Sequence, residues 1–185
     1  MIPQIEFMKA FFKNPQRVGT FAQSSQLLAQ RVTKYMDEKV RCVIELGAGT
    51  GRITEQILKR IPNNSKLLCF EIDEMLIQYL KKKFDDSRLA IINDSAENLE
   101  IYLKKYGYKK ADYIISALPL TMMPKHKRDF ILDTILSHLK KGGKYIQIQY
   151  SLNDKKRIKN FFPYQKVRFF LANIPPVFIY VCTKR

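Results

Sequence analysis

Three glycines at alternate positions, Gly47, Gly49 and Gly51, follow an apolar run that carries the carboxylate of Glu45. Glycine adopts backbone angles that other residues avoid, and without a Cβ its backbone can approach a ligand closely. A helical pattern begins at Arg52, so the segment predicts a strand, a tight turn against a ligand and then a helix. Arg52 also occupies the place of the third glycine in a dinucleotide-binding turn, which argues against that ligand class. The alternative is a glycine-rich turn without a ligand.

Acidic residues at the ends of the next two apolar runs extend this candidate site. Glu71 follows Gly51 by 20 residues, the spacing at which an acidic side chain accepts hydrogen bonds from ribose hydroxyls. Asp94 is expected to accept from an adenine amino group, unless it only caps a helix together with Glu97. Asp73 is interpreted as a helix cap. The residues expected to hold the ligand are Glu45, Gly47, Ala48, Gly49, Gly51, Glu71, Ile72, Asp94, Ser95, Ala96 and Ser116.

The elements that must position these residues alternate along the chain. Strands are expected at 41–46, 66–71, 89–92, 111–116, 145–150, 167–171 and 177–183. Helices are expected at 52–61, 74–84, 97–106, 125–140 and 155–161, with the fourth ended by Gly142-Gly143. Such alternation predicts an α/β fold, a mostly parallel seven-stranded sheet with helices on both faces. No helical pattern separates the last two strands, which predicts an antiparallel strand at the sheet edge.

Composition limits the class of protein and the kind of partner. The 185 residues carry 33 Lys and Arg against 17 Asp and Glu, a net charge of +16. This excess favours a polyanionic partner, either nucleic acid or an anionic membrane surface. Cys42, Cys69 and Cys182 lie in separate apolar runs without metal-ligand spacing, so we expect buried thiols in a reducing compartment and no metal site. No signal peptide or membrane-spanning segment is expected.

The glycine motif after an acidic residue resembles motif I of class I S-adenosylmethionine (SAM) methyltransferases, whose fold is Rossmann-like. Over nearly its whole length the chain resembles the bacterial phospholipid N-methyltransferases, which methylate phosphatidylethanolamine and are related to ribosomal RNA adenine dimethylases. The segments that carry this resemblance are 11–20, 24–25, 43–51, 70–73, 116–119, 145–150 and 173–176. Gln23 departs from the pattern, because proline is expected there. The resemblance implies SAM as cofactor and methylation of a lipid head-group amine.

The end of the fourth strand, Ser116-Ala117-Leu118-Pro119-Leu120, is expected to face the methyl group. Methyltransferases that act on base amino groups carry Asn or Asp before a step that ends in an aromatic residue. Here Ala117 lacks the polar side chain and Leu120 lacks the ring, so a flipped base would have neither clamp nor platform. A lipid amine is therefore preferred, and RNA adenine N6-methylation is the alternative. The candidates for contacting the amine are Tyr150, Ser116 and the carbonyl of Leu118.

Two basic and apolar segments are expected to meet the membrane. Residues 1–37 are interpreted as an amphipathic arm with lid helices, and residues 38–185 as the methyltransferase domain. The arm places Ile5, Met8, Phe11 and Phe12 at helical spacing beside lysines, so it either lies in the headgroup layer or covers the cofactor. A second contact is expected from Lys155–Arg157, Lys159, Lys166 and Arg168 with Phe161, Phe162, Phe169 and Phe170. The expected location is cytoplasmic, at the inner face of the membrane, and the oligomeric state is left open.

Overall fold

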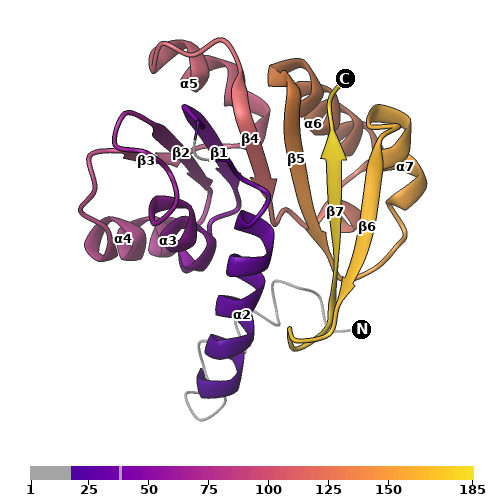
Figure 1. The fold of residues 1–185 in the computed structure, drawn as a ribbon, viewed down its shortest axis with the longest axis horizontal. Helices are drawn as coiled ribbons and strands as arrows, with labels where there is room; N and C mark the ends of the chain where they lie inside the picture. Colours follow the sequence, from indigo (N-terminus) through magenta and orange to yellow (C-terminus); the bar gives the residue numbers. More distant parts are fainter. Residues whose placement is uncertain (1–17, 38) are drawn as a thin grey trace.

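The computed structural model describes residues 18–37 and 39–185, so the predicted arm at 1–13 lies outside the described residues. Within these residues, seven strands form one sheet in the order β3-β2-β1-β4-β5-β7-β6 (Figure 1). The strands are β1 (Cys42–Leu46), β2 (Lys66–Glu71), β3 (Leu89–Asn93), β4 (Ala111–Ser116), β5 (Leu139–Gln149), β6 (Gln165–Phe170) and β7 (Val177–Thr183). The first five pair in parallel, and β7 runs antiparallel to both β5 and β6. The predicted fold class is confirmed.

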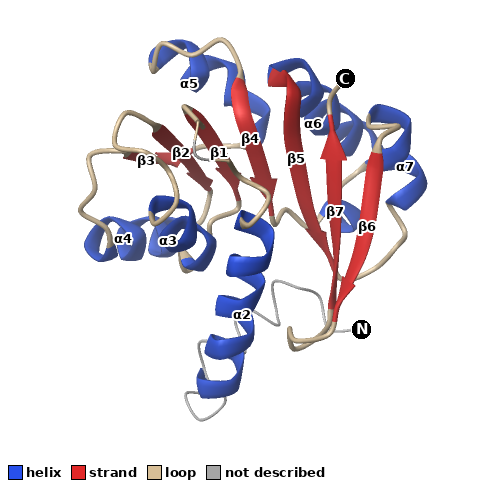
Figure 2. Cartoon of the chain, in the orientation of Figure 1, coloured by secondary structure: helices blue, strands red, loops and turns tan. Residues whose placement is uncertain are grey.

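Helices cover both faces of the sheet (Figure 2). They are α2 (Val18–Thr33), α3 (Arg52–Leu58), α4 (Glu74–Lys83), α5 (Leu99–Lys105), α6 (Lys125–His138) and α7 (Lys155–Phe161), with short 3₁₀ helices η2 (Ala96–Asn98) and η3 (Leu120–Met122). Residues of α2, α3 and α4 pack into one apolar cluster with one face, and residues of α5, α6 and α7 pack into a second cluster on the other face. None of the described helices is long and apolar enough to cross a membrane.

The order of the strands reverses beside β1, because β2 and β3 extend to one side and β4 and β5 to the other. In open α/β sheets such a reversal leaves a crevice beyond the carboxyl ends of the two central strands. The glycine turn leaves β1 at this point, and the segment from Ala117 to Leu120 leaves β4 beside it. Ala117 donates its N–H to the carbonyl of Leu46 at 2.9 Å, which holds the two loops together.

The helix predicted at 125–140 is confirmed as far as His138, but the prediction of a helix stop and a turn between residues 139 and 144 was wrong. The helix ends at His138, and β5 begins at once with Leu139, which is fully buried. The register on β4 then jumps, since Leu139 pairs with Ala111 while Lys144 pairs with Tyr113. The Gly142-Gly143 pair therefore belongs to a bulge inside a long strand, a common place for glycine, and not to a turn before the strand.

Smaller differences concern the helix after β3 and the cysteines. The helix expected at 97–106 begins as the 3₁₀ turn η2 and continues as α5, which ends at Lys105. The three cysteines are buried free thiols, as the apolar runs around them predict. Burial raises the pKa of Cys42 and of Cys182 to about 12, so these thiols stay protonated and serve the core.

Candidate active site

The glycine turn between β1 and α3 has the shape that its sequence predicts. Gly47, Gly49 and Gly51 have φ angles of 78°, 57° and 75°, in the left-handed region that favours glycine. A Cβ on Gly51 would lie 2.5 Å from the ring of Phe84 and 2.7 Å from Leu80, so this glycine lets α4 pack closely. A Cβ on Gly49 would meet nothing within 4 Å, which leaves this side of the turn open to a ligand.

Glu71 fastens the glycine turn to the end of β2. Its Oε2 accepts the N–H of Gly49 at 2.8 Å, while Oε1 accepts the N–H groups of Ile72 at 2.8 Å and Asp73 at 3.1 Å. A carboxylate offers about four acceptor positions, so the three bonds leave capacity for a ligand hydroxyl. The predicted role of Glu71 on a ribose stays a prediction, and the structure adds a second role in shaping the turn.

Glu45 lies beneath the turn as a buried acid. Its side chain is 1% exposed, and its Oε2 accepts the hydroxyl hydrogen of Thr54 at 2.6 Å. Its Oε1 has no hydrogen-bond partner in the described part of the chain. Burial raises the pKa of Glu45 to about 7 against the effect of the Thr54 bond, and the nearby charge of Glu71 raises it further. A cationic group beside Glu45 and Glu71 would offset both the burial of the Glu45 charge and its repulsion from Glu71. The two carboxylates therefore fit a ligand that carries an amino group.

Asp94 and Ser95, at the end of β3, do not form the capping arrangement that was predicted for Asp94 and Glu97. Ser95, not Asp94, caps η2, because its hydroxyl accepts the N–H of Glu97. The carboxylate of Asp94 accepts from the amide of Asn98 at 2.8 Å, the N–H of Ser95 at 2.6 Å and the hydroxyl of Tyr102 at 3.0 Å. These bonds, led by that of Asn98, lower the pKa of Asp94. The adenine contact of Asp94 stays a prediction.

The expected cap at Asp73 is confirmed. Its carboxylate accepts the N–H of Leu76 at 3.0 Å, at the start of α4. Asp73 is thus committed to the helix, while Ile72 beside it is 72% exposed over the opening of the cleft. An exposed apolar side chain at this point is available to cover a flat ligand ring.

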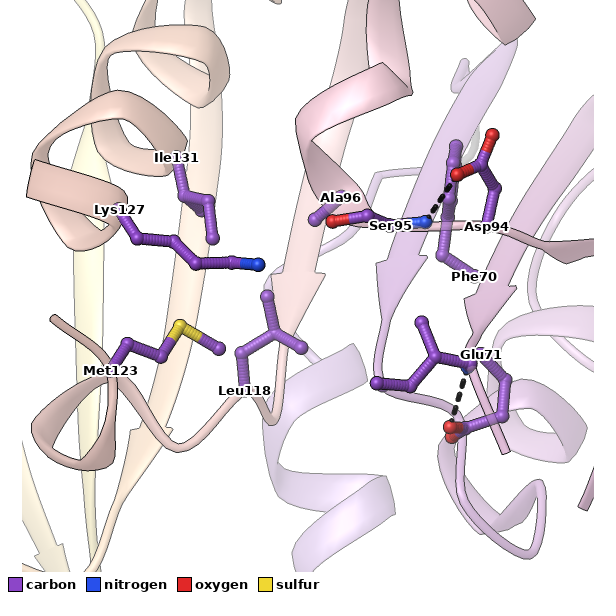
Figure 3. A pocket seen from close by; sticks show the side chains of 11 residues that line it. Phe70, Glu71, Asp94, Ser95, Ala96, Leu118, Met123, Lys127 and Ile131 are labelled. Carbon is purple, nitrogen blue, oxygen red and sulfur yellow. Dashed lines mark hydrogen bonds between the residues drawn. The ribbon is translucent and has the colours of Figure 1, made fainter.

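One cleft collects the ends of β1, β2, β3 and β4 (Figure 3). Its lining residues are Gly47, Phe70, Glu71, Ile72, Asp94, Ser95, Ala96, Leu118, Met123, Lys127 and Ile131. Six of the eleven predicted ligand residues belong to this lining. They are Gly47 and the five predicted residues at the ends of β2 and β3. Of the other five, Glu45 and Ser116 are buried, and Ala48, Gly49 and Gly51 belong to the turn without lining the cleft.

The opposite wall of the cleft, which comes from Met123 after η3 and from Lys127 and Ile131 of α6, was not predicted from the sequence. In Figure 3 Lys127 and Ile131 extend from α6 toward the side of Ser95, across the cleft from Glu71. The ammonium of Lys127 lies 2.7 Å from a carboxylate oxygen of Glu97, so an ion pair ties α6 to η2 above the cleft. No local pattern could have indicated this wall, because α6 has the sequence of an ordinary helix and only the fold brings it to the cleft.

The loop that follows β4 is expected to face the methyl group, and we call this part of the site the acceptor side. Two glutamines of β5 hold this loop. The side-chain amides of Gln147 and Gln149 donate to the carbonyl of Leu118 at 3.0 and 3.4 Å. The same carbonyl accepts the N–H of Leu120 at 2.9 Å. The Leu118 N–H donates to the hydroxyl of Ser116 at 3.3 Å, so this residue is held from both sides. A substrate amine would compete for a carbonyl that is already well occupied.

Tyr150 and Ser116, the other two candidates for the amine, lie in different surroundings. Ser116 is fully buried and supports the backbone of the loop in this conformation. Tyr150 follows the end of β5, is 42% exposed, and has a pKa raised by burial. Its phenol therefore stays neutral near pH 7, able to accept or donate a hydrogen bond. Neither residue lines the cleft, so their roles as amine contacts stay predictions.

Two kinds of methyltransferase resemble the chain in sequence. An ornithine lipid N-methyltransferase from Singulisphaera acidiphila is 27% identical over 95% of this chain and 93% of its own length. A ribosomal RNA small subunit methyltransferase A from Mesomycoplasma hyopneumoniae is 30% identical over 71% of this chain. The chain spans 46% of that second relative's length.

Solved structures share the fold at lower identity. The N-methyltransferase NodS from Bradyrhizobium japonicum superposes with a TM-score of 0.68 at 11% identity, covering 91% of this chain and 99% of that one. The plantazolicin methyltransferase BpumL, solved with S-adenosylhomocysteine, gives a TM-score of 0.62 at 11% identity, covering 100% and 91%. A family model described as a methyltransferase domain matches residues 43–143, from β1 to the bulge of β5. SAM is the cofactor of this protein. The chain belongs to the methyltransferase-domain family, as a class I SAM-dependent methyltransferase.

Proposed function

We propose that the protein transfers methyl groups from SAM to the head-group amine of a membrane phospholipid, with phosphatidylethanolamine as the substrate and phosphatidylcholine as the end of the series. SAM supplies a methyl group already activated on a sulfonium. In this proposal Glu45 faces the amino group of SAM, Glu71 accepts from its ribose, and Asp94 with the Ser95 and Ala96 amides meets its adenine. The remaining task of the chain is to align an uncharged amine with the methyl group.

The proposal rests on the side chains that follow β4, at Ala117 and Leu120. Enzymes that methylate a base amine need a polar clamp and a stacking surface for the flipped base. Ala117 offers no polar side chain, and the side chain of Leu120 is fully buried in the core. The loop thus presents no platform for a base, while a small aliphatic amine needs none.

The amine must also lose a proton before it can react. A primary ammonium has a pKa near 10, so holding it neutral at pH 7 takes roughly 4 kcal/mol of differential stabilisation. Desolvation against apolar side chains lowers an ammonium pKa without a dedicated base. Tyr150 suits this setting, because its neutral phenol can accept a hydrogen bond and its ring can hold a methylated ammonium.

The extent of the sequence match also supports a lipid substrate. The ornithine lipid relative is matched over 93% of its length, whereas the ribosomal RNA relative is matched over 46%. The first relative's name gives an amine-bearing lipid as its substrate. Ornithine lipid is therefore the second head group to compare with phosphatidylethanolamine.

A second candidate function is RNA adenine N6-methylation. The net charge of +16 and the ribosomal RNA methyltransferase relatives favour it. In this case the exposed Tyr150 would have to serve as the stacking residue, because Leu120 is buried.

The test offers both acceptors to the same enzyme. Purified protein with methyl-labelled SAM is given phosphatidylethanolamine, ornithine lipid or structured RNA, and products are read by mass spectrometry in steps of one methyl group. We expect methylated phosphatidylethanolamine, and much less with Glu71→Gln. If SAM binds by calorimetry yet no lipid gains a methyl group, the lipid assignment is wrong, and methylated RNA would establish the alternative.

A further inference from the structure

A basic groove lies on the sheet away from the cofactor cleft. Directly paired residues of antiparallel strands point to the same face. Lys166 pairs with Val181 and Arg168 with Ile179, and these two partners belong to the apolar cluster on the α2 side. We call this the β6 groove; it is lined by Tyr35, Lys144, Pro163, Tyr164, Gln165, Lys166, Arg168, Val181, Thr183 and Arg185.

The lining of the β6 groove is rich in positive charge. No acidic side chain lines it in the part of the chain that the structure describes. Lys34 directly precedes the lining residue Tyr35, and desolvation and then the charges of Arg31 and Arg168 lower the pKa of Lys34. Lys144, Lys166 and Arg168 make no ion pair within the described residues, although eight other basic side chains do. Such crowding is relieved by a ligand that carries several negative charges.

Apolar side chains are exposed where β6 leaves the groove. Phe169 is 54% exposed, Leu171 is 70% exposed and Ile174 is 48% exposed, and we call these three the β6–β7 tip. The tip lies beside the acceptor side of the enzyme, because Phe169 and Gln149 both pair with Phe178. Figure 1 shows the β6–β7 turn at the same end of the sheet as the end of β5. The cationic groove thus lies on the α2 face of β6, and the apolar tip lies at the end of this strand, next to the expected entry of the substrate. Within the tip, Phe169 points to the opposite face, because its partner Phe178 packs against the cluster of that face.

We propose that the β6 groove and the β6–β7 tip together form a docking surface for an anionic phospholipid bilayer. The cations of the groove contact lipid phosphates, and the tip enters the headgroup layer beside the end of β5. Charge complementarity selects an anionic partner, and the exposed apolar tip selects a bilayer over RNA, whose backbone would leave the tip in water. The benefit for catalysis rests on the proposed function, since docking brings the bilayer to the acceptor side; the binding itself does not depend on it.

This surface differs from the second membrane contact that the sequence predicts. That contact joined α7 to β6, but α7 lies on the opposite face, where Ile158 and Phe162 are buried in the core. Arg157 pairs with Asp129 and Asp154, so its charge is already balanced. The α7 part of the prediction is therefore wrong as an insertion site. Lys155 and Lys156 remain exposed there and provide a matched control.

The test compares two double variants of equal charge change. Lys166→Gln with Arg168→Gln neutralises the groove, and Lys155→Gln with Lys156→Gln removes the same charge from α7. Co-sedimentation is measured with vesicles of phosphatidylethanolamine and phosphatidylglycerol, after thermal melting has shown that both variants fold. At about 1 kcal/mol for each cation near an anionic leaflet, the groove variant should bind about 30-fold more weakly, while the α7 variant keeps wild-type binding. Leu171→Ser should weaken binding to anionic and to neutral vesicles.

The outcomes separate this proposal from the proposed function. Equal binding by the two double variants would overturn the docking surface, and so would a groove variant that binds vesicles normally but loses binding to single-stranded RNA. Methylation of phosphatidylethanolamine in neutral detergent micelles is measured in parallel, where the groove variant should match the wild type. A wild-type enzyme that methylates no lipid in micelles contradicts the proposed function and leaves the vesicle result to decide the docking surface.

Discussion

Replacement of Glu45 by glutamine should stabilise the fold while it weakens the binding of SAM. The carboxyl is buried with a pKa raised from 4.5 to about 7, and one of its oxygens has no hydrogen-bond partner in the described structure. At about 1.4 kcal/mol for each pKa unit, ionising this group in the folded protein costs about 3 kcal/mol more than in the unfolded chain. The side-chain amide of the Glu45→Gln variant would keep an acceptor for the hydroxyl of Thr54 without carrying this charge.

The sign of the pH dependence follows from the raised pKa. The folded protein holds the Glu45 proton more tightly than the unfolded chain, so this group costs no stability below pH 4.5. The cost grows as the pH rises from 4.5 to about 7 and is complete above that. At pH 8 the variant should therefore melt roughly 6–12 °C above the wild type, taking about 2–4 °C for each kcal/mol in a chain of this size as an upper limit.

Binding of SAM should change in the opposite direction. If the ionised Glu45 faces the amino group, wild-type affinity falls by up to tenfold for each pH unit below 7, and the variant shows weaker affinity with a much flatter profile. Differential scanning calorimetry and titration calorimetry between pH 5 and 8 measure both effects. Glu100→Gln, which alters an exposed residue with the same change of charge, is the control. Equal melting temperatures of Glu45→Gln and wild type at pH 8, with parallel pH profiles of affinity, would refute this reasoning.

Three further substitutions test other parts of the site. Gly51→Ala should lower the unfolding free energy by about 1–3 kcal/mol in urea titration, because φ is positive and the new methyl group would press on Phe84; an unchanged midpoint would contradict the packing. Gln149→Leu should lower the methylation rate with SAM affinity intact, because the Leu118 carbonyl loses a donor; a change in SAM affinity alone would oppose this role. Leu120→Tyr should cost about 1–3 kcal/mol by overpacking the core, seen as a lower melting temperature, and a stable variant that gains RNA methylation would show that this position faces a base.

The sequence was sufficient for the parts of the site that depend on short spacing. The glycine turn, its strand and helix, and the cap at Asp73 each follow from a few adjacent residues, whose backbone demands are local. The fold class followed from the alternation of apolar runs, since covered parallel strands and their crossover helices leave a clear pattern. The antiparallel pair of β6 and β7 followed from the missing helix between them.

What could not be predicted depends on register and on contacts between distant elements. The bulge in β5 needs the pairing of Leu139 with Ala111, and a Gly-Gly pair by itself resembles a helix stop. The donation by Gln147 and Gln149 to the loop after β4 depends on how two strands align. The wall formed by Lys127 comes from a helix far along the chain. None of these contacts leaves a periodic signal in one sequence.

The three backbone bonds of Glu71 have a consequence for engineering the enzyme. One carboxylate both fixes the path of the turn at Gly49 and stands where the sugar of the cofactor is proposed to lie, so the two tasks cannot be altered separately at this position. A search for variants that accept sugar-modified cofactor analogues would disturb the turn with nearly every replacement there. Ile72 is a safer starting position for such a search. Most of its side chain is exposed to water, and only its backbone N–H is bonded to Glu71.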